Sequence, residues 1–316
     1  MTGTAVEPLQ QRRADLFGLG AVLCWSTVAT AFKLSLEYFS PAQLVLFASL
    51  FSWLFLGGLL AWRGELTGLF SQFRQHWRIS LLLGALNPTL YYLVLFQAYD
   101  QLPAQEAQAL NYTWALTLSL LAVPLLGHRL RPIELIAALV CYSGVLVIAT
   151  RGDLLGLQFD NLTGVLLALA STLIWALYWI LNTRDTREPV ASLFMNVSVG
   201  ILLLLVYCAL TGELSSLDWR GLWGAGYVGL FEMGLSFVFW LLAMKLTGST
   251  ARIANLIFIS PLLSLVLIST ILDEPILAST LVGLGLILTG LGLQRLGAPK
   301  PAAQTSSESS SKADRQ

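Results

Sequence analysis

The chain has 316 residues, of which 56% are hydrophobic and 11% are charged, and its mean hydropathy is +0.73. Soluble domains carry about 25% charged residues, so this composition excludes an ordinary soluble protein and indicates a membrane protein. Lys plus Arg and Asp plus Glu are balanced at 18 each. Net charge therefore gives no reason to expect a nucleic-acid partner.

Ten apolar segments follow one another along the chain, separated by short polar links. A spanning helix needs about 20 mostly apolar residues and tolerates internal Gly and Pro. Because the links are short, a helical bundle is the only spanning architecture available. We predict an all-α integral membrane protein with ten transmembrane helices, near 16–34, 41–62, 79–98, 103–126, 132–150, 162–182, 190–210, 221–244, 249–272 and 275–295.

Basic residues gather in every second predicted link, which is the pattern of cytoplasmic loops. The other links hold few basic residues, so both termini are expected in the cytoplasm. Residues 1–15 form the predicted cytoplasmic N-terminal segment, and 297–316 a polar, disordered cytoplasmic tail. The basic residues of the predicted cytoplasmic links and ends are Arg12, Arg13, Arg63, Arg74, Arg78, Arg129, Arg131, Arg184, Arg187, Lys245, Arg295, Lys300, Lys312 and Arg315, against Lys33, Arg151 and Arg220 in the other links.

The two halves of the chain resemble each other. Aligning "FQAYDQLPAQEAQALNYTWALTLSLLAVPLLGHRLRPIELIAALVCYSGVLVI" with "LLAMKLTGSTARIANLIFISPLLSLVLISTILDEPILASTLVGLGLILTGLGL" brings Ala98 onto Ala243, 145 residues later, and Gly144 onto Gly290, 146 residues later. We therefore predict two five-helix repeats, 16–150 and 162–296, joined by a linker at 151–161. An odd number of spans inverts the second repeat, and such repeats are typical of secondary transporters with a substrate site near the midplane.

A carboxylate stands inside the eighth predicted span, in "YVGLFEMGLSFVFW". The repeat aligns Asn87 of the first half with Glu232 of the second. Pro88 directly follows Asn87 and should bend the third span. Acids within a membrane are costly and usually line pathways, although a packing role for Glu232 remains an alternative. As a site residue it would bind a substrate amine or carry a coupling proton.

Other polar and aromatic residues fall on the same predicted helix faces. Aromatic rings are equally common as anchors at the membrane interface, so each one is a candidate on position alone. Glu106 and Arg252 coincide under the repeat and could close a gate as an ion pair, or each could be solvated on its own side. With Asn87 and Glu232, the candidate substrate-binding residues are Tyr91, Asn111, Trp114, Trp175, Tyr178, Ser236 and Trp240.

Four stretches resemble a known family: "LFGLGAVLCWSTVATAFK", "NYTWAL", "LIWALYWILNTR" and the ending "DEP…GLGLILTGLGL". They are similar to the EamA family of the drug/metabolite transporter superfamily, and the first three to its bacterial aromatic-amino-acid exporters. The resemblance implies a ten-helix carrier of the bacterial inner membrane that exports amino acids or other small metabolites. It also implies a central cavity lined by spans one, three, four, six, eight and nine.

Enzymes and channels are two other classes of membrane protein. A membrane enzyme is disfavoured, because the only histidines, His76 and His128, fall in predicted loops without a ligand-spaced partner cluster. A channel-like facilitator, or a carrier of drugs or other metabolites with the same fold, stays open as an alternative. We expect no cofactor and no metal, and the predicted partners are a small-molecule substrate and the lipid bilayer.

Overall fold

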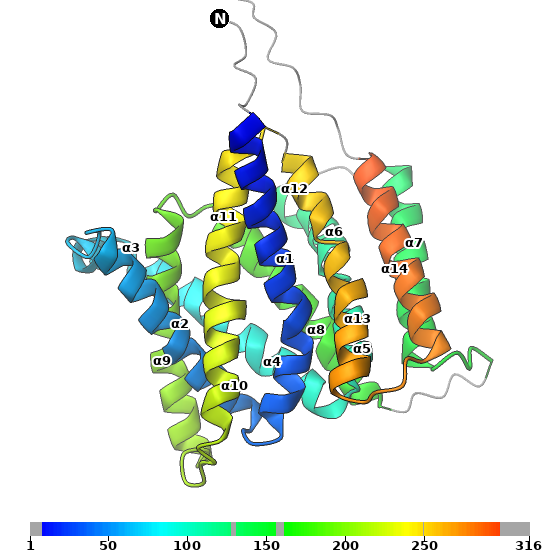
Figure 1. Cartoon of the computed structure of the whole chain (residues 1–316), viewed down its shortest axis with the longest axis horizontal. Helices are drawn as coiled ribbons and strands as arrows, with labels where there is room; N and C mark the ends of the chain where they lie inside the picture. The colour runs from blue at the N-terminus through cyan, green and yellow to red at the C-terminus, as the bar shows by residue number, and fades with distance from the viewer. Residues whose placement is uncertain (1–7, 128–130, 156–160, 249, 298–316) are drawn as a thin grey trace, which may run out of the picture.

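The computed structural model describes residues 8–127, 131–155, 161–248 and 250–297. Every regular element within these ranges is helical, which confirms the all-α class (Figure 1). The elements are α1 (Pro8–Leu36), α2 (Pro41–Trp62), α3 (Leu69–Gly84), the π-helical segment η1 (Ala85–Leu90), α4 (Tyr91–Gln101), α5 (Ala104–Asn111), α6 (Trp114–Leu126), α7 (Pro132–Ala149), α8 (Leu162–Asn182), α9 (Pro189–Thr211), α10 (Gly221–Tyr227), the π-helical segment η2 (Val228–Leu235), α11 (Ser236–Leu246), α12 (Thr250–Leu256), α13 (Ile259–Ile271) and α14 (Ala278–Gly297).

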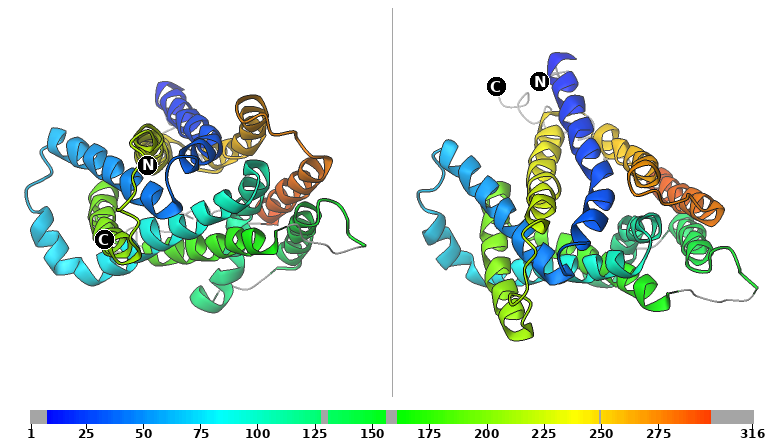
Figure 2. Two further views of the ribbon diagram at one scale, coloured as in Figure 1. Left: turned by 90° about the horizontal axis from the view of Figure 1, so that it is seen from below. Right: turned by 60° about the horizontal axis from the view of Figure 1, so that its bottom comes forward.

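Eight helices among the described residues are long and apolar enough to cross a membrane, when helices that continue through a π-helical segment or a short break count as one. A shorter apolar helix, α13, follows them, and the 20-residue α14 ends the described chain. α7 and α14 pack together at one end of the molecule, whereas α2, α3 and α9 lie at the other (Figure 1, Figure 2). Between these ends stand α1, α4, α8, α11 and α13.

Two helices begin earlier than the hydropathy pattern predicts. α1 starts at Pro8, so part of the expected N-terminal segment is helical, and α3 starts at Leu69. His76, expected in a loop, lies inside α3 at a kink with φ −116° and ψ 21°. Hydropathy detects only the lipid-embedded part of a helix, while Gln, Arg and Ala continue it into the polar zone. His128 and the terminal segments 1–7 and 298–316 lie outside the described residues.

The third and eighth predicted spans are both interrupted by a π-helical segment. In η1 the Asn87–Pro88 peptide bond is cis. Asn87 has an extended backbone (φ −143°, ψ 118°), so the third span departs from regular helix next to Pro88, where a bend was predicted. In η2, Ser236 Oγ donates to the Glu232 carbonyl at 2.7 Å, and Ser52 Oγ donates to the Met233 carbonyl at 3.0 Å. These side chains bind carbonyls of a π-helical segment, whose hydrogen-bond pattern differs from that of the flanking α-helices.

Glycines allow close contact between helices on both sides of the core. A Cβ on Gly84 would lie 2.4 Å from the Asn196 carbonyl oxygen, and one on Gly229 would lie 2.2 Å from that of Ala48. Either distance is a clash, so α3 could not approach α9, nor η2 approach α2, with a larger residue there. The π-helical segments are thereby fixed against their neighbours α9 and α2.

Candidate functional site

The described residues enclose a cavity of about 140 Å³ in the middle of the bundle. Its walls come from α1, α4, the α5–α6 region, α8, the η2–α11 region and the α12–α13 break. These are the six spans that the family resemblance implies. Ten of the sixteen lining residues are aromatic; the full lining is Trp25, Val28, Phe32, Tyr91, Leu95, Tyr99, Gln108, Asn111, Tyr112, Trp114, Trp175, Trp179, Glu232, Phe237, Trp240 and Ile257.

Glu232 reaches this cavity from η2 and is 9% exposed. The hydroxyl of Tyr92, on α4, donates to Glu232 Oε1 at 3.0 Å. Glu232 Oε2 has no hydrogen-bond partner among the described residues. A buried acceptor without a partner is expensive, so Oε2 is the natural position for a donor that enters the cavity.

Stacked rings determine the shape of the aromatic wall. Trp175 stacks on Tyr91, with ring centroids 4.4 Å apart and an interplanar angle of 26°, and on Tyr178 at 5.5 Å and 23°. Trp25 and Trp240 form a second, tilted pair with centroids 5.3 Å apart. Packed rings lose little freedom when a ligand binds, so the wall is preorganised for a flat, apolar group.

Few polar groups interrupt the aromatic surface. Asn111 Nδ2 donates to Ser171 Oγ at 3.0 Å, which orients the amide at the end of α5. The indole nitrogen of Trp179 is buried and has no partner among the described residues. The cavity therefore combines one carboxylate, a few neutral polar groups and aromatic walls, a composition that suits a small amphipathic molecule.

Six of the nine residues proposed from sequence line this cavity: Tyr91, Asn111, Trp114, Trp175, Glu232 and Trp240. The other three lie just outside its lining. Asn87 is buried in η1 with its Oδ1 unpaired among the described residues, and Tyr178 faces an adjoining cavity. Ser236 is fully buried, with its hydroxyl bound to its own helix.

The structure does not form the proposed gate between Glu106 and Arg252. Glu106 pairs with Arg151 at 3.0 Å, whereas Arg252 pairs with Asp15 at 2.7 Å. Glu106 near the start of α5 and Arg252 near the start of α12 therefore belong to two separate ion pairs.

The sequence-based selection missed several lining residues, among them Trp25, Trp179 and Phe237. Trp25 is the counterpart of Trp175 in the repeat, and Trp179 lies one turn after Trp175, so both could have been found. Tyr92 gave no such signal, because neighbouring residues of a regular helix point about 100° apart. Its contact with Glu232 joins residues 140 positions apart, so only the tertiary structure shows it.

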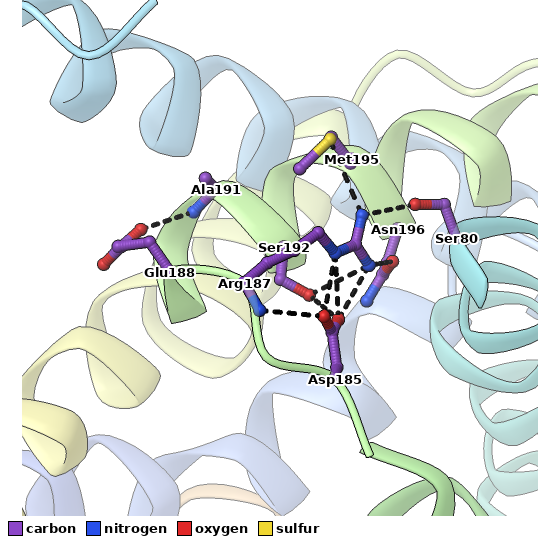
Figure 3. A network of polar contacts seen from close by, with 8 residues as sticks. All are labelled: Ser80, Asp185, Arg187, Glu188, Ala191, Ser192, Met195 and Asn196. Carbon is purple, nitrogen blue, oxygen red and sulfur yellow. Dashed lines mark hydrogen bonds and ion pairs between the residues drawn. The ribbon is translucent and has the colours of Figure 1, made fainter. Parts of the chain in front are cut away.

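A second cavity of about 130 Å³ adjoins the first, and Trp179 and Phe237 line both. Its polar side is the link between α8 and α9, where Arg187 is buried instead of lying in an exposed loop (Figure 3). Arg187 Nε donates to Asp185 Oδ1 at 2.8 Å, and Nη2 donates to Oδ2 at 2.7 Å. Burial alone would raise the pKa of Asp185, but the hydrogen bonds from Arg187 and Ser192 lower it to about 2.

The remaining donors of Arg187 connect this link to two helices. Nη1 donates to Ser80 Oγ of α3 at 2.6 Å, and Nη2 donates to Ser192 Oγ and Asn196 Oδ1 of α9, both at 3.2 Å (Figure 3). We call Ser80, Asp185, Arg187, Ser192 and Asn196 the Arg187 network. It holds α3, the α8–α9 link and α9 together beside the cavities.

Among the described residues, no three His, Cys, Asp or Glu side chains are grouped closely enough to hold a metal ion. The three cysteines, Cys24, Cys141 and Cys208, are free thiols within helices.

Comparison with known proteins then decides the family, because residues 12–150 and 162–294 each match the EamA-like transporter family. The chain belongs to this family. It is therefore a multi-pass membrane protein of a transporter family. The EamA-like match occurs twice, once in each half of the sequence, and together the matches cover nearly all the described helices.

Relatives of this EamA-like protein have been named. It is 27% identical over 295 residues to the uncharacterized transporter YvbV of Bacillus subtilis (strain 168), covering 91% of this chain and 93% of the relative. It is 28% identical over 273 residues to the aromatic amino acid exporter YddG of Ancylobacter novellus, covering 82% and 89%. The chain is also similar to a solved structure whose description is only "Crystal structure of protein". The TM-score is 0.63 and the identity 26%, and the match covers 90% of this chain and 99% of the other.

Proposed function

We propose that the protein is a secondary transporter of the bacterial inner membrane that exports small metabolites carrying an aromatic or apolar group and an amino group, with amino acids as the first class to test. The observation that carries the proposal is the central cavity, where a carboxylate with one unpaired oxygen faces aromatic walls from six helical segments. The relative named as an aromatic amino acid exporter supports the same class.

Alternating access requires two halves that can rock about the site, and we propose ten spans arranged as two inverted five-helix repeats, 16–150 and 162–296. The π-helical segments support this, because η1 ends at Leu90 and η2 ends at Leu235, 145 residues later. The close helix contacts at glycines recur at the same spacing. Gly84 approaches α9 as Gly229 approaches α2, again 145 residues apart.

The α7–α14 pair gives independent support for a twofold relation. A Cβ on Gly144 would lie 2.5 Å from the Gly283 carbonyl oxygen, and one on Gly290 would lie 2.7 Å from that of Ala137. Gly290 follows Gly144 by 146 residues, and Gly283 follows Ala137 by the same number. Exchanging the two helices therefore reproduces their contact, as expected for the last spans of two repeats.

Orientation follows from the basic residues: both termini and the links near 70, 129 and 186 lie in the cytoplasm in this proposal. Within the site, Trp and Tyr rings stack on the substrate ring, while Asn111 hydrogen-bonds its polar end. Glu232 binds the substrate amine or carries a proton in exchange for it. Tyr92 fixes one oxygen of Glu232 and leaves the other for this role.

Counterflow in proteoliposomes tests the proposal. Vesicles loaded with unlabelled phenylalanine should transiently accumulate labelled phenylalanine from outside, and the initial rate should saturate with concentration. A linear rate without counterflow would favour a channel-like facilitator and contradict a carrier.

Glu232→Gln keeps the size of the side chain but removes its charge, and Glu65→Gln, at an exposed turn, is the matched control. Loss of proton-driven accumulation with preserved exchange assigns Glu232 to coupling, and loss of exchange as well assigns it to amine binding. If Glu232→Gln behaves as Glu65→Gln does at every pH, Glu232 is a packing residue.

A further inference from the structure

We propose that the central cavity prefers aromatic amines without a carboxylate, such as decarboxylated or esterified amino acids, over the free amino acids. The proposal rests on the carrier function given above and narrows its substrate class. It follows from the balance of charge in the cavity lining rather than from its size.

Glu232 is the one acidic side chain in the described lining, and the described lining includes no Lys, Arg or His. A protonated amine can donate to Glu232 Oε2, which has no partner among the described residues. That contact pairs two opposite charges in a buried site and satisfies an acceptor. A zwitterionic amino acid brings the same amine and, in addition, a carboxylate that meets no cation.

Two cations next to cavity-lining residues or to the adjoining cavity have other partners. Lys33, next to the lining residue Phe32, donates from Nζ to the Tyr99 carbonyl at 2.8 Å and to the Leu102 carbonyl at 2.9 Å. These carbonyls end α4, where a cation is favourable. Arg187 lies by the adjoining cavity, with donors on Asp185, Ser80, Ser192 and Asn196.

Neutral donors offer little compensation for a buried carboxylate. The Tyr92 hydroxyl is engaged by Glu232, and the Asn111 amide donates to Ser171. The Trp179 indole N–H has no partner among the described residues and the Gln108 amide also faces the cavity, but such neutral donors suit a hydroxyl or an ester better than an anion close to Glu232. Burying an anion without a counter-charge is strongly unfavourable.

The aromatic walls act in the same direction. Five tryptophans line the cavity, and tryptophan is the best side chain for holding a cation over its ring face. Trp25 and Trp240, with centroids 5.3 Å apart, present a pair of such rings from α1 and α11. Ring faces attract an ammonium group and repel a carboxylate, because their quadrupoles are negative above the ring.

Four ligands with one indole ring test the proposal on the purified full-length protein. Tryptamine has the amine alone, tryptophan methyl ester has the amine and a neutral ester, tryptophan has both charges, and indole-3-propionate has the carboxylate alone. By calorimetry at pH 7, we expect tryptamine and the ester to bind at least tenfold more tightly than tryptophan, with indole-3-propionate the weakest. Tryptophan binding as tightly as tryptamine would overturn the proposal.

Two variants connect the preference to the cavity. Glu232→Gln should bring the tryptamine-to-tryptophan affinity ratio close to one, while Glu65→Gln should leave it unchanged. Gln108→Lys adds a cation to the lining and should improve tryptophan relative to tryptamine. A ratio that Glu232→Gln does not change would contradict the proposal.

Different results would overturn the carrier function and the amine preference. Saturable counterflow of phenylalanine together with a preference for tryptophan would leave the carrier function standing and overturn the amine preference. Absence of both counterflow and binding of all four ligands would overturn the carrier function, and the amine preference with it.

Discussion

Replacing Arg187 by Met should destabilise the protein strongly, although Arg187 belongs to a segment with the sequence features of an exposed loop. The guanidinium is 3% exposed and its partner Asp185 is 5% exposed. Arg187→Met keeps much of the side-chain volume but removes the charge and every donor. Asp185 then remains buried without a counter-cation, and Ser80 and Asn196 each lose a hydrogen bond.

The expected loss follows from breaking a buried ion pair on one side only, which costs about 3–5 kcal/mol. The lost neutral hydrogen bonds, each worth roughly 1 kcal/mol, belong to the same network and are not simply additive. We therefore expect about 4 kcal/mol, which at about 2–4 °C per kcal/mol lowers the Tm by on the order of 10 °C. Asp185→Asn combined with Arg187→Met should recover part of this loss, because no buried charge remains.

The chain provides a control of the same spacing. Asp218 and Arg220 form the same Asp-x-Arg pair at 2.5 Å, but there the guanidinium is 73% exposed. Arg220→Met should leave the Tm unchanged, since exposed ion pairs contribute little. Thermal unfolding of detergent-solubilised protein, followed by size-exclusion chromatography after heating, measures both. Equal Tm values for Arg187→Met and Arg220→Met would refute the stabilising role of the Arg187 network.

Four further results are expected. Tyr92→Phe removes the donor to Glu232 Oε1 and should raise the half-saturation concentration for transport about tenfold with normal folding, because a hydrogen bond to a charged group is worth about 1.5–3 kcal/mol; an unchanged value would mean that other contacts fix Glu232. Trp175→Ala removes the stacks with Tyr91 and Tyr178 and should weaken substrate binding by about 1 kcal/mol in a binding assay; unchanged affinity would make these rings structural. The pKa of Asp185 is lowered to about 2, against about 3.9 in the unfolded chain, so its contribution to stability should be complete above pH 4 and disappear as the pH falls towards 2, and pH-dependent unfolding of the parent and Asp185→Asn measures the difference. Single cysteines near residues 70 and 186 should react with impermeant reagents from the cytoplasmic side and those near 155 and 216 from the opposite side; chain ends on opposite faces would contradict the inverted repeat.

Hydropathy and charge predicted the helical class because a membrane-embedded backbone must satisfy its own hydrogen bonds. They could also indicate Glu232, since one acid in a long apolar run has few explanations. Hydropathy and charge could not predict that the Arg187 side chain is buried. Arg184 and Arg187 fit the pattern of a cytoplasmic loop, and the Asp-x-Arg spacing at Asp185 occurs again at Asp218, where the pair is exposed. The difference lies in the packing of α3 against α9, which no local pattern encodes.

The π-helical segments are likewise only partly indicated by the local sequence. Pro88 marks the break in η1, because proline lacks the N–H of a regular helix. η2 contains no proline, and its only local signals are Gly229 and Gly234. Its π-helical turns leave carbonyls for other donors, and Ser52 of α2 binds that of Met233. That contact joins residues 181 positions apart, so only the tertiary structure shows it.

In the proposed repeat, the two spans that contain η1 and η2 place Asn87 and Glu232 at equivalent depth in the membrane. Both side chains keep an unpaired oxygen among the described residues, Oδ1 of Asn87 and Oε2 of Glu232, yet only Glu232 lines the central cavity. A carboxamide cannot ionise, so of these two side chains only Glu232 could exchange a proton. The close backbone contacts of Gly84 and Gly229 recur 145 residues apart, whereas the side chains at positions 87 and 232 differ in chemistry. The substrate amine and the coupling proton would then compete for one oxygen of Glu232, which is sufficient for obligatory exchange without a second acidic residue.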